Sequence, residues 1–207
     1  DLYNWSGVKR NKAIWLGGGV SLGFLTTLEF MDGFSSEWGF SWTDMAFNTL
    51  GSALFVGQQF LFDAQPIKLK YSFHKSGLAH LRPNVLGGSF AEQLLKDYNG
   101  QTYWLSVAPG QFSKKSKFPK WITFDFGYSG NNMISGSDDY YVINNGLETQ
   151  VLESYRQYYL SFGIDLSKIP VKSKFLKMLF KTINIIKFPF PAVEFSKHGV
   201  KFHPFYF

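Results

Sequence analysis

Cysteine is absent from this sequence of 207 residues. A chain without cysteine has no disulfide framework, no thiol nucleophile and no thiolate ligands for a metal ion. Histidine is nearly as scarce, with four in the chain, and none lies in an HExxH pattern or at another close ligand spacing. We therefore expect no zinc site, and we assign no residue as a metal ligand.

Several other chemical signatures are also missing. Gly17, Gly18 and Gly19 are followed by neither a GK[ST] nor a GxGxxG pattern, and no serine lies within GxSxG. RNP and helix-turn-helix patterns are absent, and the formal net charge of +6 is modest. We expect no cofactor and no nucleic-acid partner. We expect the excess of basic residues to attract acidic lipid head groups instead.

Charged residues make up only 17% of the chain, whereas aromatic residues make up 19%. Such a share of rings is high for a soluble domain and suits a protein at a membrane interface. No internal repeat and no shift in composition divides the chain, so we expect one domain over residues 1–207. Its apolar residues follow a helical pattern in residues 12–62 and mainly an alternating pattern in residues 67–207.

Two apolar segments, Ala13–Met31 and Thr43–Phe62, flank a short loop. Each is close to the ~20 residues that cross a hydrocarbon layer as a helix. Glycine recurs in both, and small residues let helices approach closely in lipid. The pattern predicts a close-packed helical hairpin with a polar seam. A hairpin that spans a bilayer as two helices is a further possibility.

From Ile67 onward apolar side chains alternate with small or polar ones, most clearly in residues 67–73, 101–108, 122–128 and 158–166. A half-buried sheet produces this alternation, and so does a lipid-facing barrel. The predicted fold class is α+β, with the glycine-rich hairpin packed with an antiparallel sheet or a small membrane-associated β-barrel of about six to eight strands.

Shorter features interrupt the predicted strands. Ser89 and Glu92 form a capping box that opens a short helix near residues 90–98. Residues 130–150 are rich in Gly, Ser, Asn and Asp, which predicts an exposed loop. Pro189 and Pro191 break the chain before a closing hairpin.

A second short helix is predicted over residues 172–186. Its apolar side chains fall on one face and its lysines on the other, so it either covers the sheet or lies on an anionic membrane surface. The chain ends on an aromatic strand, as outer-membrane barrels commonly do. The residues that we expect to contact the membrane or a partner are Trp5, Trp15, Phe175, Leu179, Phe180, Phe205 and Phe207.

One group of residues offers a chemical alternative. Glu29, Asp32 and Asp44, together with Asn48, fall at spacings that share helix faces. Carboxylates that converge in a low-dielectric seam could act as acid and base or hold a cation. The structural alternative is that Asp44 caps a helix, Asn48 bonds across the hairpin, and Glu29 pairs with a basic residue such as Arg82.

The segment Glu29–Gly51 combines a glycine-rich helix, an acidic pair, a Gly-Phe-Ser turn, Asp44 and Asn48. In these features it resembles the YfiM-like predicted periplasmic lipoproteins. The stretches Arg82–Gly87 and Lys96–Ser106 resemble the longer, Bacteroidota-type members of that group. The resemblance implies a location in the cell envelope. It implies no chemistry, because the family is a domain of unknown function.

Two hypotheses follow. The first is a non-enzymatic accessory or structural component of an envelope protein assembly, at the periplasmic side of the cell outer membrane or embedded in it. Its partners would be outer-membrane lipids and other envelope proteins. The second is an envelope enzyme that acts on lipid or cell-wall material through Glu29, Asp32 and Asp44. It requires these carboxylates to line an open pocket.

Overall fold

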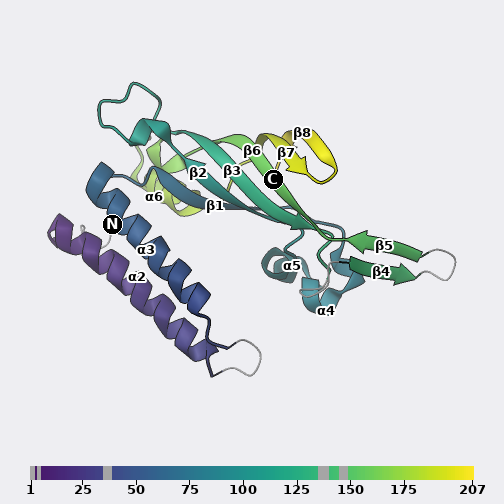
Figure 1. The fold of residues 1–207 in the computed structure, drawn as a ribbon. Coiled ribbons are helices and arrows are strands. Elements are labelled where there is room, and N and C mark those ends of the chain that lie inside the picture. The colour runs from purple at the N-terminus through teal and green to yellow at the C-terminus, as the bar shows by residue number, and fades with distance from the viewer. Residues whose placement is uncertain (1–2, 4–5, 35–38, 135–139, 145–148) are drawn as a thin grey trace. The chain divides into compact units, whose positions relative to one another are not determined.

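A computed structural model describes residues 3, 6–34, 39–134, 140–144 and 149–207 (Figure 1). The fold is α+β, as the sequence predicts. The chain divides into two compact units, which we describe separately. Unit 1 comprises Asp1–Pro66 with Gln111–Lys114, and unit 2 comprises Ile67–Gly110 with Lys115–Phe207.

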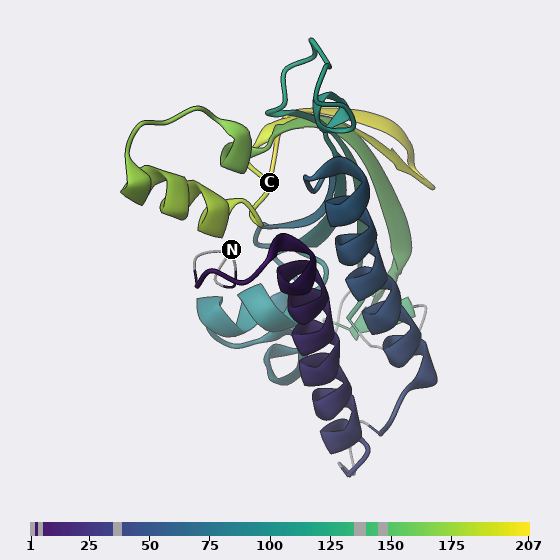
Figure 2. The same ribbon diagram turned by 90° about the vertical axis from the view of Figure 1, so that its left-hand side faces the viewer.

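Unit 1 is built on the predicted helical hairpin, formed by α2 (Arg10–Asp32) and α3 (Trp42–Phe62), which lie antiparallel (Figure 2). The Ser41 side chain caps α3 by accepting a hydrogen bond of 3.2 Å from the Asp44 amide, which satisfies one of the free donors at the helix start. By length and composition, α2 could cross a membrane. Most of its side chains are exposed within unit 1 and give no sign of a buried core helix.

The two helices touch most closely at a glycine. A Cβ atom built on Gly18 would lie 2.5 Å from Cγ2 of Val56, a separation that side chains do not tolerate. At the open end of the hairpin, Arg10 donates to Asp63 and to the Gln59 carbonyl. The side chains of Lys114 and Arg10 hold the pKa of the Asp63 carboxyl below its usual value through hydrogen bonds. Polar groups therefore tie α2 to the end of α3.

This contact gives a matched test of helix packing. Gly18→Ala is expected to lower the free energy of unfolding by about 1–2 kcal/mol, because the clash with Val56 outweighs the better helix propensity of alanine. A Cβ on Gly23 meets nothing within 4 Å, so Gly23→Ala is expected to raise stability by about 0.5–1 kcal/mol. Thermal unfolding of both variants in detergent measures the difference. Equal shifts would contradict the close contact.

Unit 2 is organised around an antiparallel sheet of six strands (Figure 1). In spatial order its strands are β1 (Ile67–Phe73), β2 (Gln101–Val107), β3 (Ile122–Asn131), β6 (Tyr155–Ile164), β7 (Phe190–Ser196) and β8 (Gly199–Tyr206). The sheet is open, and β1 and β8 are its edges in the described part of the chain. The alternative prediction of a closed barrel is therefore wrong. A barrel requires the first and last strands to pair.

Short helices lie in the connections between the strands of the sheet. The β1–β2 connection carries η1 (Ala79–Leu81), α4 (Pro83–Leu86) and α5 (Phe90–Lys96). The predicted capping box of Ser89 and Glu92 is confirmed at the start of α5. The remaining elements are η2 (Pro109–Gln111), which lies at the boundary between the units, and η3 (Leu166–Lys168) and α6 (Lys174–Ile183), which follow β6.

Two local expectations were wrong. Residues 130–150 contain the strand β4 (Tyr140–Asn144) and part of β5 (Thr149–Glu153), which form a second, two-stranded sheet. Pairing between these segments overrides their turn-rich composition. Pro191 lies inside β7, where the sequence predicted a break, because the register shift between Phe190 and Ala192 accommodates a residue that has no amide proton.

Candidate functional site

The two faces of the six-stranded sheet have the reverse of the usual polarity. The inner face is buried but largely polar or charged, with Lys70, Asp125 and Glu194 each at most 3% exposed. The opposite face, which we call the outer face, consists of large apolar and aromatic side chains and is exposed. Its members are Leu69, Tyr103, Leu105, Phe124, Phe126, Tyr128, Tyr158, Leu160, Phe162, Phe195, Val200 and Phe202. This apolar-out, polar-in alternation is that of strands that face lipid.

Strand register sorts the outer face into rows. One row is aromatic and runs across five strands through Tyr71, Tyr103, Tyr128, Tyr158 and Phe195. Tyrosine combines an apolar ring with a polar hydroxyl, so it is enriched where hydrocarbon meets water. The row is therefore arranged as a boundary of the apolar area.

The hydroxyl groups of this row point toward polar partners. The Tyr103 hydroxyl donates a 2.8 Å hydrogen bond to the side chain of Gln101, one row further from the apolar area. Arg156 donates to the Tyr128 hydroxyl and also lies over its ring, 5.7 Å from the centroid. At the β1 edge the Tyr71 hydroxyl donates to the Leu94 carbonyl, and burial raises its pKa to about 12.

Beyond the tyrosines lies a row without polar side chains. It runs through Leu69, Leu105, Phe126, Leu160 and Val193, and continues to Phe202 of β8. This row and the next, which contains Phe124 and Phe162, form the centre of the outer face.

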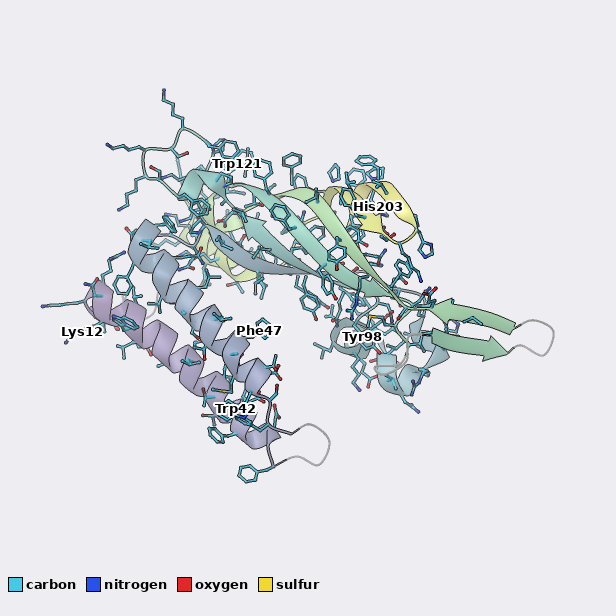
Figure 3. All side chains as sticks on the ribbon, in the orientation of Figure 1. Lys12, Trp42, Phe47, Tyr98, Trp121 and His203 are labelled. Atoms are coloured by element: carbon cyan, nitrogen blue, oxygen red, sulfur yellow. The ribbon has the colours of Figure 1, made fainter. Side chains whose placement is uncertain are left out.

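The other boundary of the apolar area is basic. Ile122 pairs with Ile164, so the loop before β3 and the segment after β6 leave the same end of the sheet. That loop, residues 115–121, reads Lys-Ser-Lys-Phe-Pro-Lys-Trp and has no acidic residue. Figure 3 shows Trp121 at this end of the sheet, and Lys115, Lys117 and Lys120 of the loop are exposed. From Tyr128 to Ile122 is six residues, or about 20 Å of strand.

A shallow groove of about 400 Å³ lies within the outer face. It crosses β3, β6, β7 and β8, and its lining is almost wholly apolar. The lining residues are Phe124, Asp125, Phe126, Leu160, Ser161, Phe162, Pro191, Val193 and Phe202. The Phe118 ring of the basic loop stacks on Phe124, with centroids 6.3 Å apart, so the loop reaches one side of the groove.

A segment of chain seals the inner face. Residues 185–187 pair with the edge of β1 through two backbone hydrogen bonds with Tyr71, each 2.8 Å long. From there the Lys187 ammonium reaches across to the Phe162 carbonyl of β6 at 2.7 Å and to the Asp125 carboxylate of β3 at 3.3 Å. Both charged side chains are at most 1% exposed. Burial lowers the pKa of Lys187, and the adjacent carboxylate opposes this shift.

A second buried carboxylate organises the basic end of the sheet. Asp165 accepts hydrogen bonds from Lys68 of β1, from Ser167 of η3 and from Asn184 just after α6. These bonds hold the two ends of the segment between β6 and residue 184, which contains η3 and α6. Hydrogen bonds and ion pairs between buried side chains thus link strands across the polar inner face, while the apolar side chains of the other face point outward.

The predicted carboxylate cluster is only partly assembled. Glu29 is buried, and its carboxylate accepts a 2.6 Å hydrogen bond from the Ser41 amide, which ties the end of α2 to the start of α3. Asp32 and Asp44 are exposed, and Asp44 occupies the first turn of α3, where a carboxylate favours the helix dipole. Asn48 is half-buried.

These carboxylates do not gather into one site. Among the described residues, no three His, Asp or Glu side chains lie close enough to hold a metal ion. Arg82, the suggested partner of Glu29, donates to the Ile134 carbonyl in unit 2. The observed contacts of Glu29 and Ser41 are those of helix capping.

The predicted contact residues are mostly exposed. Trp15 and Phe175 are each 65% exposed, Leu179, Phe205 and Phe207 are exposed too, and Phe180 is half-buried. Trp5 lies outside the described residues. Sequence reasoning did not single out the side chains of β2, β3 and β6 that make the centre of the outer face. Their alternation was visible, but the signal that marks them, tyrosines aligned across strands, needs the register.

Comparison with known proteins gives a match within the first unit. Residues 1–58 match the family described as predicted periplasmic lipoprotein (DUF2279). The resemblance inferred from Glu29–Gly51 is thereby confirmed over the hairpin, whereas the assignment to a Bacteroidota type stays a prediction. No curated protein and no solved structure matches the chain.

Proposed function

We propose that this protein is a non-enzymatic accessory component of the cell envelope that associates with the outer membrane through the outer face of its sheet. The observation that carries the proposal is the inverted polarity of that sheet. Side chains such as Leu69 and Phe126, 73% and 50% exposed, face outward while Asp125 and Glu194 are buried. An apolar surface of this extent on a soluble monomer marks a membrane or protein contact.

Lipid is the contact that the layout of this face supports. Tyrosines bound the apolar rows at one end, and Trp121 with the lysines of residues 115–120 bounds them at the other. Aromatic rings and basic side chains are the usual neighbours of lipid head groups. The family match at residues 1–58 supports an envelope location, since that family is described as periplasmic lipoproteins.

The proposed contact is with one leaflet. The apolar rows extend about 20 Å along a strand, less than the ~30 Å of a hydrocarbon core. The sheet is also open at β8, and unpaired edge groups are not tolerated within hydrocarbon. The outer face therefore contacts the hydrocarbon of one leaflet, while the unpaired edge of β8 stays at the polar interface.

Two further surfaces extend this proposal. On α6 the apolar side chains Phe175 and Leu179 are exposed opposite its lysines, so this helix suits a second interfacial contact. The hairpin of unit 1 exposes Phe24, Phe47 and Leu61 on its helices. We assign these side chains to contacts with other envelope proteins.

Flotation with phospholipid vesicles tests the membrane contact. Serine at Leu69, Leu105 and Tyr158 removes three exposed outer-face side chains that do not line the groove. If each contributes about 1 kcal/mol on contact with lipid, roughly half the value for full burial, the variant should bind about 100-fold more weakly. The readout is the lipid concentration needed for half-maximal flotation.

A matched variant controls for a general loss of apolar surface. Val85, Leu95 and Val151 are exposed on other elements, and replacing all three with serine should leave flotation unchanged. Phe175→Ser with Leu179→Ser measures the share of α6 in the same assay. Wild-type binding by the outer-face variant, with its sheet intact by circular dichroism, would contradict the proposal.

A further inference from the structure

We propose that the outer-face groove binds one acyl chain of an anionic phospholipid, and that the lysines of residues 115–120 hold its phosphate. This inference rests on the proposed function, because it names the ligand of one part of the same face. The observations that carry it are the lining of the groove and the position of the basic loop beside it.

The apolar lining of the groove favours a hydrocarbon ligand. The side chains that open into the groove are rings and aliphatic groups, among them Phe126, Leu160 and Phe202. The two polar residues on its strands turn elsewhere. Asp125 is buried on the inner face beside Lys187, and the Ser161 hydroxyl donates to the Pro191 carbonyl. With no polar side chain directed into it, the groove offers contact to an apolar ligand only.

The size of the groove suits a single chain. Its volume of about 400 Å³ lies near the lower limit for sites that hold a small molecule. The groove runs across four neighbouring strands, which lie about 5 Å apart. It is therefore longer than a single side chain, as an extended acyl chain requires, but too small for a folded partner.

The basic loop supplies the second half of the site. Phe118 connects it to the groove by stacking on Phe124. Lys115, Lys117 and Lys120 are exposed around it, and residues 112–121 contain no acidic side chain. Lysine attracts phosphate as a point charge without demanding one fixed geometry. A lipid whose tail enters the groove beside Phe124 would thus place its head group near these lysines.

Titration with single-chain lipids tests the site without a bilayer. The probes are lysophosphatidylglycerol, which is anionic, and lysophosphatidylcholine of the same chain length, which is zwitterionic, both below their aggregating concentrations. We expect saturable binding at one site, about 10-fold tighter for the anionic lipid. Free phosphate should not compete, because the apolar groove supplies most of the affinity.

Three variants separate the two halves. Phe126→Ser with Leu160→Ser should abolish binding of both lipids. Lys117→Gln with Lys120→Gln should remove the preference for the anionic lipid and leave the affinity for the zwitterionic one within about twofold. Leu69→Ser, on the outer face but outside the groove, should bind as the wild type does.

The outcomes are distinct from those of vesicle flotation. If the wild type floats with vesicles but binds neither single-chain lipid, the proposed function survives and the groove assignment is overturned. Unchanged binding in the groove variant overturns it as well. Equal affinity for both lipids in the wild type overturns the role of the lysines. An apolar peptide that occupies the groove while neither lipid binds would assign the groove to a protein partner and refute the lipid site.

Discussion

Lys187→Ala is expected to lower the free energy of unfolding of the sheet by about 3–5 kcal/mol. The reason is the buried pair that Lys187 forms with Asp125, in which both side chains are at most 1% exposed. Removing the ammonium breaks the ion pair of a buried carboxylate, and it also removes one hydrogen-bond donor to the Phe162 carbonyl. The midpoint of urea unfolding in a mild detergent, followed by circular dichroism, measures the loss.

A double variant separates the charge from the packing. Asp125→Asn with Lys187→Met removes both charges of this pair and preserves approximate volumes, so it should recover more than half of the stability that Lys187→Ala loses. Lys197 pairs with Glu153 at the surface, and Lys197→Ala should cost less than about 1 kcal/mol. Similar losses for Lys187→Ala and Lys197→Ala would contradict the inner-face network.

Gly163→Ala is expected to be similarly damaging. Gly163 of β6 lies opposite Thr123 on the inner face, and a Cβ there would come within 1.9 Å of Oδ2 of Asp125 and 2.7 Å of the Thr123 hydroxyl. The added methyl group would push the Asp125 carboxylate away from Lys187. We expect a loss of about 3 kcal/mol or more from overpacking and the weakened ion pair together.

The clash has its own internal control. In a background of Asp125→Ala with Lys187→Met, the atom nearest to the new Cβ is gone, although the Thr123 hydroxyl remains close, so Gly163→Ala should cost less than half of its effect in the wild type. Urea unfolding of the four proteins forms a double-mutant cycle. Additive losses would show that Gly163 does not make room for Asp125.

Much of the local structure followed from the sequence. The helical pattern of residues 13–31 and 43–62 predicted α2 and α3 closely, and the cap at Ser89 is where its spacing placed it. The alternation in residues 122–128 predicted β3. These features depend on neighbours within a few residues, so a single sequence contains them. The family resemblance also rested on short continuous segments.

The sequence by itself thus determined the two long helices, most strands of the main sheet with their apolar and polar faces, and the high aromatic content. Only the tertiary structure decided which sheet face is buried, because that depends on the chain segment that covers it. Residues 185–187 bind the edge of β1 and place Lys187 beside Asp125, which makes the polar face the inner one. The open edge at β8, the tyrosine row and the groove likewise arise from the pairing of strands that are distant in the sequence. The local periodicity of a single sequence does not determine how such strands pair.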